Sequence, residues 1–380
     1  MGRPAAENQR SAGCARDVCR SVLIRGTGLD LRGLCPHCVH AELAVATDVG
    51  AAAFYASPDL QRWTRVGEFA RDDLGLLECP DIFEMTADDG STHWVLGVSA
   101  NARHRDLPAT YAYWTGAFDG ADFIPDAHEP RWLDWGFDFY GAVTYPHHAA
   151  DGREDPGLRH VIGWANFWDY PHNTPTLVTD GYNGDDMIVR DLRLVRRDGG
   201  YHLASSPTAA LGEYSTATHE IGDIRVEGIH ELAVHSLSFE LSCEIEWDPA
   251  QPPEDLGIEV CRAQGGSRHV DVGIRPGDAV SYLDRRLTIN PTAGRTSAAL
   301  GDADGRMAIR LLVDRTSVEL FVGDGRVVHS HRVFPLAGDD GIRLYSHGGG
   351  SVFRDLRVHE LSLKPAAAAD VEMAPAGPVP

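Results

Sequence analysis

The chain has 380 residues, 43% of them hydrophobic, and a formal net charge of −22 at pH 7. This composition is typical of a globular protein with a sizeable core, and the negative charge argues against nucleic acids and anionic membrane surfaces as partners. A neutral partner such as a sugar is compatible with that charge. The sequence contains no run of about 20 consecutive apolar residues, which a membrane-spanning helix would need.

The first 45 residues do not share the sequence pattern of the rest. Four of the seven cysteines lie in this segment, at positions 14, 19, 35 and 38. The last two form a C-x-x-C pair, which alone is a weak signal for a zinc or redox site, so we predict no metal site and no cofactor. The segment opens without the apolar run of a secretory signal, and the chain as written is expected to stay in the cytoplasm.

From residue 46 onward, short segments rich in aromatic and β-branched residues alternate with turn residues, a pattern that predicts an all-β fold. We place a first β domain at 46–215. A second, at 220–363, is predicted as a β-sandwich, because strict alternation puts one face of each strand inward. The alternating residues are Ile309, Leu311, Val313, Val318, Leu320 and Val322. The segment 364–380 is rich in Ala and Pro and is expected to form a flexible or disordered tail.

Three stretches of the first β domain carry candidate chemistry. Glu78 stands inside the apolar run "LLECPDIFEM", and "LDWGFDFYGAVTYP" (133–146) and "IGWANFWDYPHNTPT" (162–176) combine Trp and Tyr with Asp and Asn. Burial disfavours the charged form of a carboxyl group, which suits a general acid. Aromatic faces beside polar groups are typical of carbohydrate sites, although each aromatic residue taken alone is equally consistent with sheet core.

Taken together, these motifs resemble glycoside hydrolase family 32, the β-fructofuranosidases that include levanases, inulinases and invertases. Further blocks that resemble the family, in the family's order, are "FYASPDLQRW", "DFYGA", "WANFWDYPHNTPT" and "LLVDRTSVELF". The resemblance covers about residues 50–363. It implies a five-bladed β-propeller followed by a β-sandwich, with 46–215 as the later blades. It also implies a retaining hydrolase of fructans (levan, inulin) or of sucrose, which is extracellular in its intact form.

The resemblance assigns roles to individual residues. Glu78 matches the general acid/base of the family's E-C-P motif, and Tyr140 matches an aromatic residue that lines the pocket. Substrate contacts are also implied for Cys79, Trp168 and Tyr182. Tyr182 stands where many members carry a tryptophan beneath the bound fructose, and this departure points to a subgroup such as levanases or levan fructotransferases.

The nucleophile that the family uses was not found in the sequence. A retaining glycosidase needs a second carboxylate about 5–5.5 Å from the first, and the family takes it from an N-D-P block near the start of the propeller. The sequence contains no N-D-P triplet. We therefore expect that the N-terminal nucleophile blade is missing and that residues 1–45 are non-native or read from a shifted frame.

Three hypotheses about function remain open from the sequence. The first is a fructan-degrading hydrolase with Glu78 as acid/base. The second is an inactive, truncated family member that binds fructans, and the third is a lectin-like β-sandwich module attached to a degenerate propeller. Because Asp81, Asp134 and Asp138 lie in motifs to which the family assigns no nucleophile, the chain as written is expected to be inactive on sucrose, inulin and levan.

Overall fold

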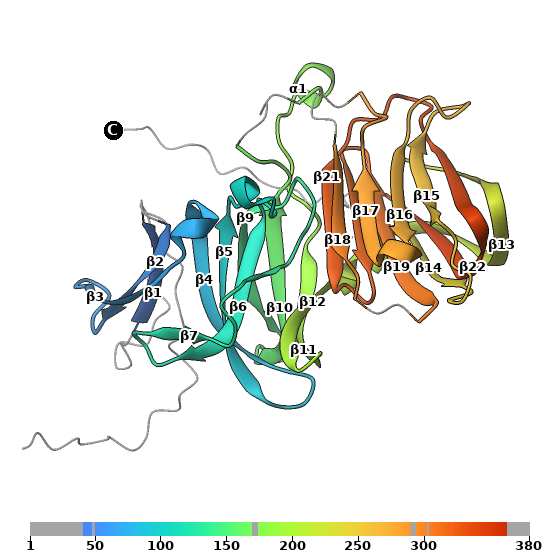
Figure 1. The fold of residues 1–380 in the computed structure, drawn as a ribbon. Helices are drawn as coiled ribbons and strands as arrows, with labels where there is room; N and C mark the ends of the chain where they lie inside the picture. Colours follow the sequence, from blue (N-terminus) through green and yellow to red (C-terminus); the bar gives the residue numbers. More distant parts are fainter. Residues whose placement is uncertain (1–40, 48–49, 169–173, 290–293, 302–303, 363–380) are drawn as a thin grey trace, which may run out of the picture.

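The computed structural model describes residues 41–47, 50–168, 174–289, 294–301 and 304–362. The CPHC motif and the predicted tail lie outside these residues. The described part is nearly all β (Figure 1), which confirms the predicted fold class. It contains no helix long and apolar enough to cross a membrane.

Three antiparallel sheets follow one another along the first half of the chain and lie side by side like propeller blades (Figure 1). The first comprises β1 (Ala41–Thr47), β2 (Ala51–Ser57) and β3 (Thr64–Ala70). The second comprises β4 (Leu77–Thr86), β5 (Thr92–Ala100), β6 (Tyr111–Phe118), β7 (Phe123–Pro125) and β8 (Arg131–Trp132). The third comprises β9 (Tyr140–His148), β10 (Glu154–Trp164), β11 (Arg190–Arg197) and β12 (Gly200–Pro207).

Apolar side chains fill the space between successive sheets. One cluster, which includes Phe54 and Trp114, joins the first sheet to the second. Another, which includes Phe83 and Leu192, joins the second to the third. Such face-to-face packing of small sheets is the packing of a propeller. The strand β1 begins at Ala41, inside the segment 1–45 that the sequence set apart, and pairs with β2 along its whole length.

The second half of the chain forms the β-sandwich. Its strands are β13 (Ser215–His235), β14 (Phe239–Trp247), β15 (Asp255–Arg262), β16 (Val270–Arg275), β17 (Val280–Asp284), β18 (Arg295–Ala299), β19 (Arg306–Asp314), β20 (Ser317–Val322), β21 (Val327–Arg332) and β22 (Gly341–Leu361). The long strand β22 pairs with β13, β14 and β15 through several register shifts, so a single sheet folds over on itself.

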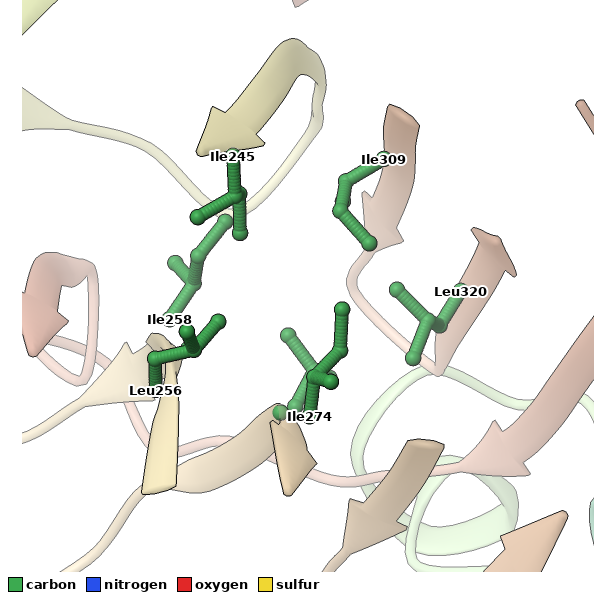
Figure 2. A pocket seen from close by; sticks show the side chains of 9 residues that line it. Ile245, Leu256, Ile258, Ile274, Ile309 and Leu320 are labelled. Carbon is green, nitrogen blue, oxygen red and sulfur yellow. The ribbon is translucent and has the colours of Figure 1, made fainter. Parts of the chain in front are cut away.

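The predicted alternation in the sandwich is confirmed. In the β19–β20 hairpin, Ile309 pairs with Val322, Leu311 with Leu320, and Val313 with Val318. All six side chains are buried in the sandwich core. Figure 2 shows the centre of this core, where isoleucines and leucines of the two layers face each other across a small apolar space.

A buried arginine joins the third sheet to the sandwich. The Arg190 side chain, on β11, donates to Asp134 Oδ2 at 2.8 Å and to Glu319 Oε2 of β20 at 2.7 Å. Its guanidinium also lies 3.9 Å from the centre of the Phe139 ring. Asp134 accepts three further hydrogen bonds, from the backbone N–H of Gly136 and from the backbone N–H and the hydroxyl of Ser330 on β21. The segment 133–139 is therefore fixed to the sandwich by fully hydrogen-bonded buried charges.

A second buried ion pair lies beside the first. Arg285 donates to Asp138 Oδ2 at 2.6 Å, and the backbone N–H of Arg332 donates to the same oxygen at 2.7 Å. The sequence had grouped these aspartates with a carbohydrate site. The structure corrects this interpretation, because Asp134 and Asp138 are buried at the contact between the two domains.

Two buried histidines lie at the same contact. His329 and His331, on β21, share the hydroxyl of Thr296 on β18, and His329 also contacts the hydroxyl of Ser281. The ring of Phe137 stacks on His331 at 4.7 Å. The first strand of the sheet order, β18, and the last, β21, thus meet where the segment 133–139 docks.

The Arg190 contact predicts a large stability effect. Arg190→Met leaves the carboxylates of Asp134 and Glu319 buried without their cation, and breaking a buried pair in this way costs about 3–5 kcal/mol. We expect this loss in the free energy of unfolding measured with urea. The matched control is Arg62→Met, because the pair of Arg62 with Asp59 is exposed and exposed pairs contribute little. Equal effects of the two changes would refute the structural role of Arg190.

The histidines predict acid sensitivity. Burial lowers the pKa of His329 to about 3 and the pKa of His331 well below its usual range. In the unfolded chain a histidine takes up a proton below about pH 6.5. The stabilisation that comes from the neutral rings is therefore fully present above that pH and is lost as the pH falls, at up to about 1.4 kcal/mol per pH unit for each histidine.

The measurement is urea unfolding at a series of pH values from about 7 down to about 4.5, the range in which this proton uptake acts. We expect the stability of the wild-type chain to fall more steeply over this range than that of the double variant His329→Gln/His331→Gln. His104→Gln is the control, because His104 is exposed. Equal slopes for the wild-type chain and the double variant would contradict the prediction.

Candidate active site

Glu78 lies at a β-bulge near the start of β4. In the pairing with β5, Glu78 is opposite Ser99 and Asp81 is opposite Gly97, so β4 carries one additional residue here. Cys79, inside the bulge, has a φ of 49°, a left-handed backbone conformation that is uncommon for residues other than glycine. Bulges of this kind redirect side chains and are frequent next to active sites.

The bulge leaves Glu78 more accessible than its neighbours. Leu77 and Cys79 are buried, at 0% and 6% exposure, whereas Glu78 is half-buried. The carboxyl group that stands inside the apolar run of the sequence is thus only partly buried in the fold. The inward position of Cys79 shows what the residue contributes to the fold, namely the backbone turn that presents Glu78. Its predicted contact with substrate stays a prediction.

Tyr140 is the partner of Glu78. Its hydroxyl donates to Glu78 Oε2 at 2.7 Å. Tyr140 is the first residue of β9, and its buried ring meets the ring of Phe167 edge-on at 4.9 Å. Two residues 62 positions apart in the sequence are thus brought together by neighbouring sheets, and the phenol holds the carboxyl group in one orientation.

Asp81, just after the bulge, is engaged elsewhere. Its Oδ2 atom accepts hydrogen bonds from the backbone N–H of Thr144, at 3.0 Å, and from the Thr144 hydroxyl. Burial raises the pKa of Asp81, while the Arg159 charge and the Thr144 hydrogen bonds oppose that rise. Asp81 therefore gives β4 a second contact with β9 beside the Glu78–Tyr140 contact, since Tyr140 and Thr144 belong to the same strand.

The other two predicted aromatic residues are partly exposed. Trp168 is 58% exposed, and its ring lies 5.0 Å from that of Trp164, which pairs with Tyr140 across β9 and β10. Tyr182 is 41% exposed, and burial together with the nearby carboxylates of Asp185 and Asp180 raises its pKa. Trp168 therefore extends the aromatic cluster around Tyr140, and the place of Tyr182 beneath a sugar stays a prediction.

The chain matches two family models that follow each other. The model described as "Glycosyl hydrolases family 32 N-terminal domain" matches residues 39–207, and "Glycosyl hydrolases family 32 C terminal" matches residues 209–360. The chain belongs to glycoside hydrolase family 32. The resemblance expected from the sequence motifs is confirmed.

Two curated relatives in the family are levanases. The chain is 40% identical over 311 residues to a levanbiose-producing levanase of Bacillus subtilis (strain 168), covering 80% of this chain and 59% of that protein. It is 39% identical over 245 residues to a levanbiose-producing levanase of Geobacillus stearothermophilus, covering 64% of this chain and 60% of the relative. The chain thus spans about three fifths of the length of these two relatives.

Solved structures of the family share the fold. An exo-inulinase from Aspergillus awamori superposes with a TM-score of 0.72 at 23% identity, covering 85% of this chain and 67% of that one. A fructofuranosidase from Schwanniomyces occidentalis complexed with fructose gives 0.65 at 17% identity, covering 83% and 66%. At these identities the likeness shows the architecture, a propeller followed by a sandwich.

Two further residues lie beside the candidate site and were missed from the sequence. The Arg103 guanidinium lies 4.4 Å from the centre of the Phe167 ring. Asn166 is buried, its Oδ1 accepts the backbone N–H of Phe167, and its Nδ2 lacks a hydrogen-bond partner within the described residues. The only sequence signal for Asn166 was its place between Trp164 and Trp168. The sequence carried no signal for Arg103, because the aromatic residues that it contacts are distant in sequence.

The three aspartates of the motifs all have partners away from Glu78. Asp81 binds Thr144, Asp134 binds Arg190, and Asp138 binds Arg285. That none of these three serves as the second carboxylate of a retaining glycosidase stays a prediction. Within the described residues, no group of three or more His, Cys, Asp or Glu side chains is arranged to hold a metal ion.

The backbone at Cys79 predicts a position-specific stability effect. Cys79→Val places a β-branched residue at a φ of 49°, and such strain costs about 1–3 kcal/mol. Cys243→Val is the matched control, because Cys243 is also buried but lies in the regular strand β14. We expect the free energy of unfolding to fall clearly more for Cys79→Val. A larger loss for the control would contradict the strained bulge.

Proposed function

We propose that the chain is the acid/base-bearing part of a glycoside hydrolase that cleaves β-fructofuranosidic bonds in fructans, with levan as the favoured substrate and Glu78 as the general acid/base. The observation that carries this proposal is the hydrogen bond from Tyr140 to Glu78 at the bulge of the family 32 E-C-P motif. The preference for levan rests on the two levanases that are about 40% identical to this chain; inulin and sucrose are the alternatives.

Glu78 supplies the proton in this mechanism. Its carboxyl group protonates the oxygen that leaves with the rest of the fructan as the anomeric bond breaks, and the resulting carboxylate then takes a proton from the attacking water. The Glu78 carboxyl group is half-buried, and this partial exposure suits both proton transfers. The Tyr140 hydroxyl, fixed by the packing of its ring against Phe167, holds the acid toward the leaving oxygen.

A retaining mechanism also needs a nucleophile on the opposite side of the sugar. We infer that this carboxylate comes from a segment that carries the N-D-P block typical of the family, because Asp81, Asp134 and Asp138 have other partners. The engagement of these three aspartates by other partners also supports a second candidate function. In that function, this chain binds fructan through its aromatic cluster without cleaving it.

The test of Glu78 uses the chain joined to a segment that carries the N-D-P block. We expect Glu78→Gln to lower kcat on levan by a factor on the order of 10²–10⁴, as loss of a general acid does. KM should change little, and substrates with activated leaving groups should be affected less, because their leaving oxygen needs less protonation. The measurements are reducing-sugar release and rates on an activated fructoside.

The matched control is Glu84→Gln, because Glu84 lies on the same strand and is also half-buried. Its kcat should stay close to that of the unchanged chain. A Glu78→Gln variant with an unchanged rate would refute the assignment of the acid. Hydrolysis by the chain without the added segment, lost in Glu78→Gln, would show instead that one of the three aspartates serves as nucleophile.

A further inference from the structure

An asparagine–glycine pair lies in the loop that follows the short helix α1 (Thr176–Thr179) (Figure 1). Of all the asparagines in the sequence, only Asn183 is followed by glycine. Asn183 is exposed, and residues 182–185 belong to no helix or strand. The glycine matters chemically, because a residue without a side chain lets its backbone nitrogen approach the side-chain amide of the residue before it.

Two donors hold the side-chain amide oxygen of Asn183. The backbone N–H of Thr174 donates to Asn183 Oδ1 at 2.8 Å, and the Thr174 hydroxyl donates to the same atom at 3.1 Å. Because a backbone N–H can only donate, its partner must be the amide oxygen, which fixes the orientation of the Asn183 side chain. The amide nitrogen, Nδ2, donates to no acceptor in the part of the chain that the structure describes.

Both donors belong to a residue that is itself fixed. Thr174 is 3% exposed, and its carbonyl accepts the backbone N–H of Leu177 in α1 at 3.1 Å. The hydroxyls of Thr174 and Thr176 are in contact. Since the Thr174 proton goes to Asn183, Thr176 supplies the proton of this contact. The two donors of Thr174 therefore stay in place while the oxygen that they bind changes its charge.

This pair of donors has the geometry of a small oxyanion hole. When a nucleophile attacks an amide carbon, negative charge develops on the amide oxygen, and donors already about 2.7–3.1 Å from that oxygen stabilise it. A nucleophile is present in the next residue, because the backbone N–H of Gly184 donates to no acceptor within the described residues. Attack within one chain also avoids the entropy cost of bringing two molecules together.

We propose that Asn183 is a self-modification site, at which the folded chain promotes the conversion of this asparagine to aspartate or isoaspartate. The Gly184 nitrogen loses its proton to hydroxide and bonds to Asn183 Cγ, and the charge that forms on Oδ1 is held by the two Thr174 donors. The Cγ–Nδ2 bond then breaks, and ammonia leaves with a proton taken from water.

Water opens the succinimide that remains. Breaking the bond between the Gly184 nitrogen and Asn183 Cγ gives aspartate. Breaking the bond between the same nitrogen and the Asn183 backbone carbonyl gives isoaspartate, in which the backbone runs through the side chain. Water and hydroxide are the only other reactants, so the step needs no oxidant, reductant or second enzyme.

The modified residue lies beside the candidate active site. Tyr182 directly precedes Asn183, and the Asp185 carbonyl accepts the backbone N–H of Ala165, next to the aromatic cluster, at 2.9 Å. An isoaspartate lengthens the backbone between Tyr182 and Asp185 by a carbon atom. Either product also adds a carboxylate close to that of Asp185, whose charge already acts on Tyr182. We therefore expect the conversion to displace Tyr182 and to weaken fructan binding, an effect that rests on the proposed function.

The experiment keeps the whole chain in mildly alkaline buffer and follows the mass of the peptide that contains Asn183. Conversion exchanges an NH₂ group for OH, and isoaspartate is detected separately by enzymatic methylation. Asn101, which precedes Ala102, is the internal reference. We expect Asn183 to convert faster than Asn101, and faster in the folded chain than in the chain unfolded with urea, because unfolding removes both Thr174 donors. Faster conversion in the unfolded chain would overturn the proposal.

A matched pair of variants tests the donors directly. Thr174→Val removes the hydroxyl donor and keeps the backbone N–H, and it should slow the conversion about two- to tenfold, the loss expected for one hydrogen bond to the developing oxyanion. Thr179→Val is the control, because the Thr179 hydroxyl contacts the Pro175 carbonyl and not Asn183. An unchanged or higher rate in Thr174→Val would refute the role of the donors.

Calorimetric titration with a levan oligosaccharide measures the consequence for the site. The unchanged chain should lose affinity as Asn183 converts, whereas Asn183→Gln, kept in the same buffer, should not. Equal affinity of the fresh and the converted chain would refute the displacement of Tyr182. The mass measurement does not depend on the proposed function, so a fresh chain that binds no levan would overturn that function and leave the test of Asn183 intact.

Discussion

The position of the candidate site depends on the buried Arg190 contact. Arg190 joins β11 of the third sheet to Asp134 in the connecting segment and to Glu319 in the sandwich, and all three side chains are buried. The segment that Asp134 anchors ends at Phe139, whose ring packs against the same guanidinium. The next residue is Tyr140, the partner of Glu78. The backbone that presents the Tyr140 phenol to Glu78 is therefore fixed by an ion network at the domain contact.

This arrangement explains why the domain contact is polar at all. Burying charges costs several kcal/mol per ion, and an apolar contact of the same volume is often equally stable. An arginine held by two carboxylates, however, is satisfied in only one geometry, because its donors form a fixed fork. We infer that the network fixes the third sheet, the segment 133–139 and the sandwich in one arrangement, and that the position of Tyr140 follows from it.

The sequence predicted the regular strands, but it did not predict the contacts between residues that are distant in sequence. Period-two alternation predicted the strands β19 and β20 and the side chains that they turn inward, because alternation is a local property of a strand. Asp134 and Asp138 were grouped with a sugar site, since an aspartate beside aromatic residues has the same local pattern whether it binds a sugar or an arginine. Their partners lie 56 and 147 positions away, and no local pattern specifies such pairings. The motif resemblance predicted roles for Glu78 and Tyr140, but it did not contain the bulge or Arg103.

The bulge at Cys79 shows how strain and anchoring combine at Glu78. A left-handed residue other than glycine persists only when its surroundings over-determine it, and here two contacts do so. On one side of Cys79, Glu78 is bound by Tyr140; on the other, Asp81 is bound by Thr144. Both partners lie on β9, so the two hydrogen-bonded carboxyl groups hold β4 against β9 at two points. The extra residue, Cys79, lies between these two points and therefore cannot adopt an extended backbone conformation. The apolar run around Glu78 then packs inward, while the bulge presents the glutamate alone to the Tyr140 hydroxyl. The same local distortion thus makes a carboxyl group in a core strand available for proton transfer, which a regular strand of this sequence would bury or turn away.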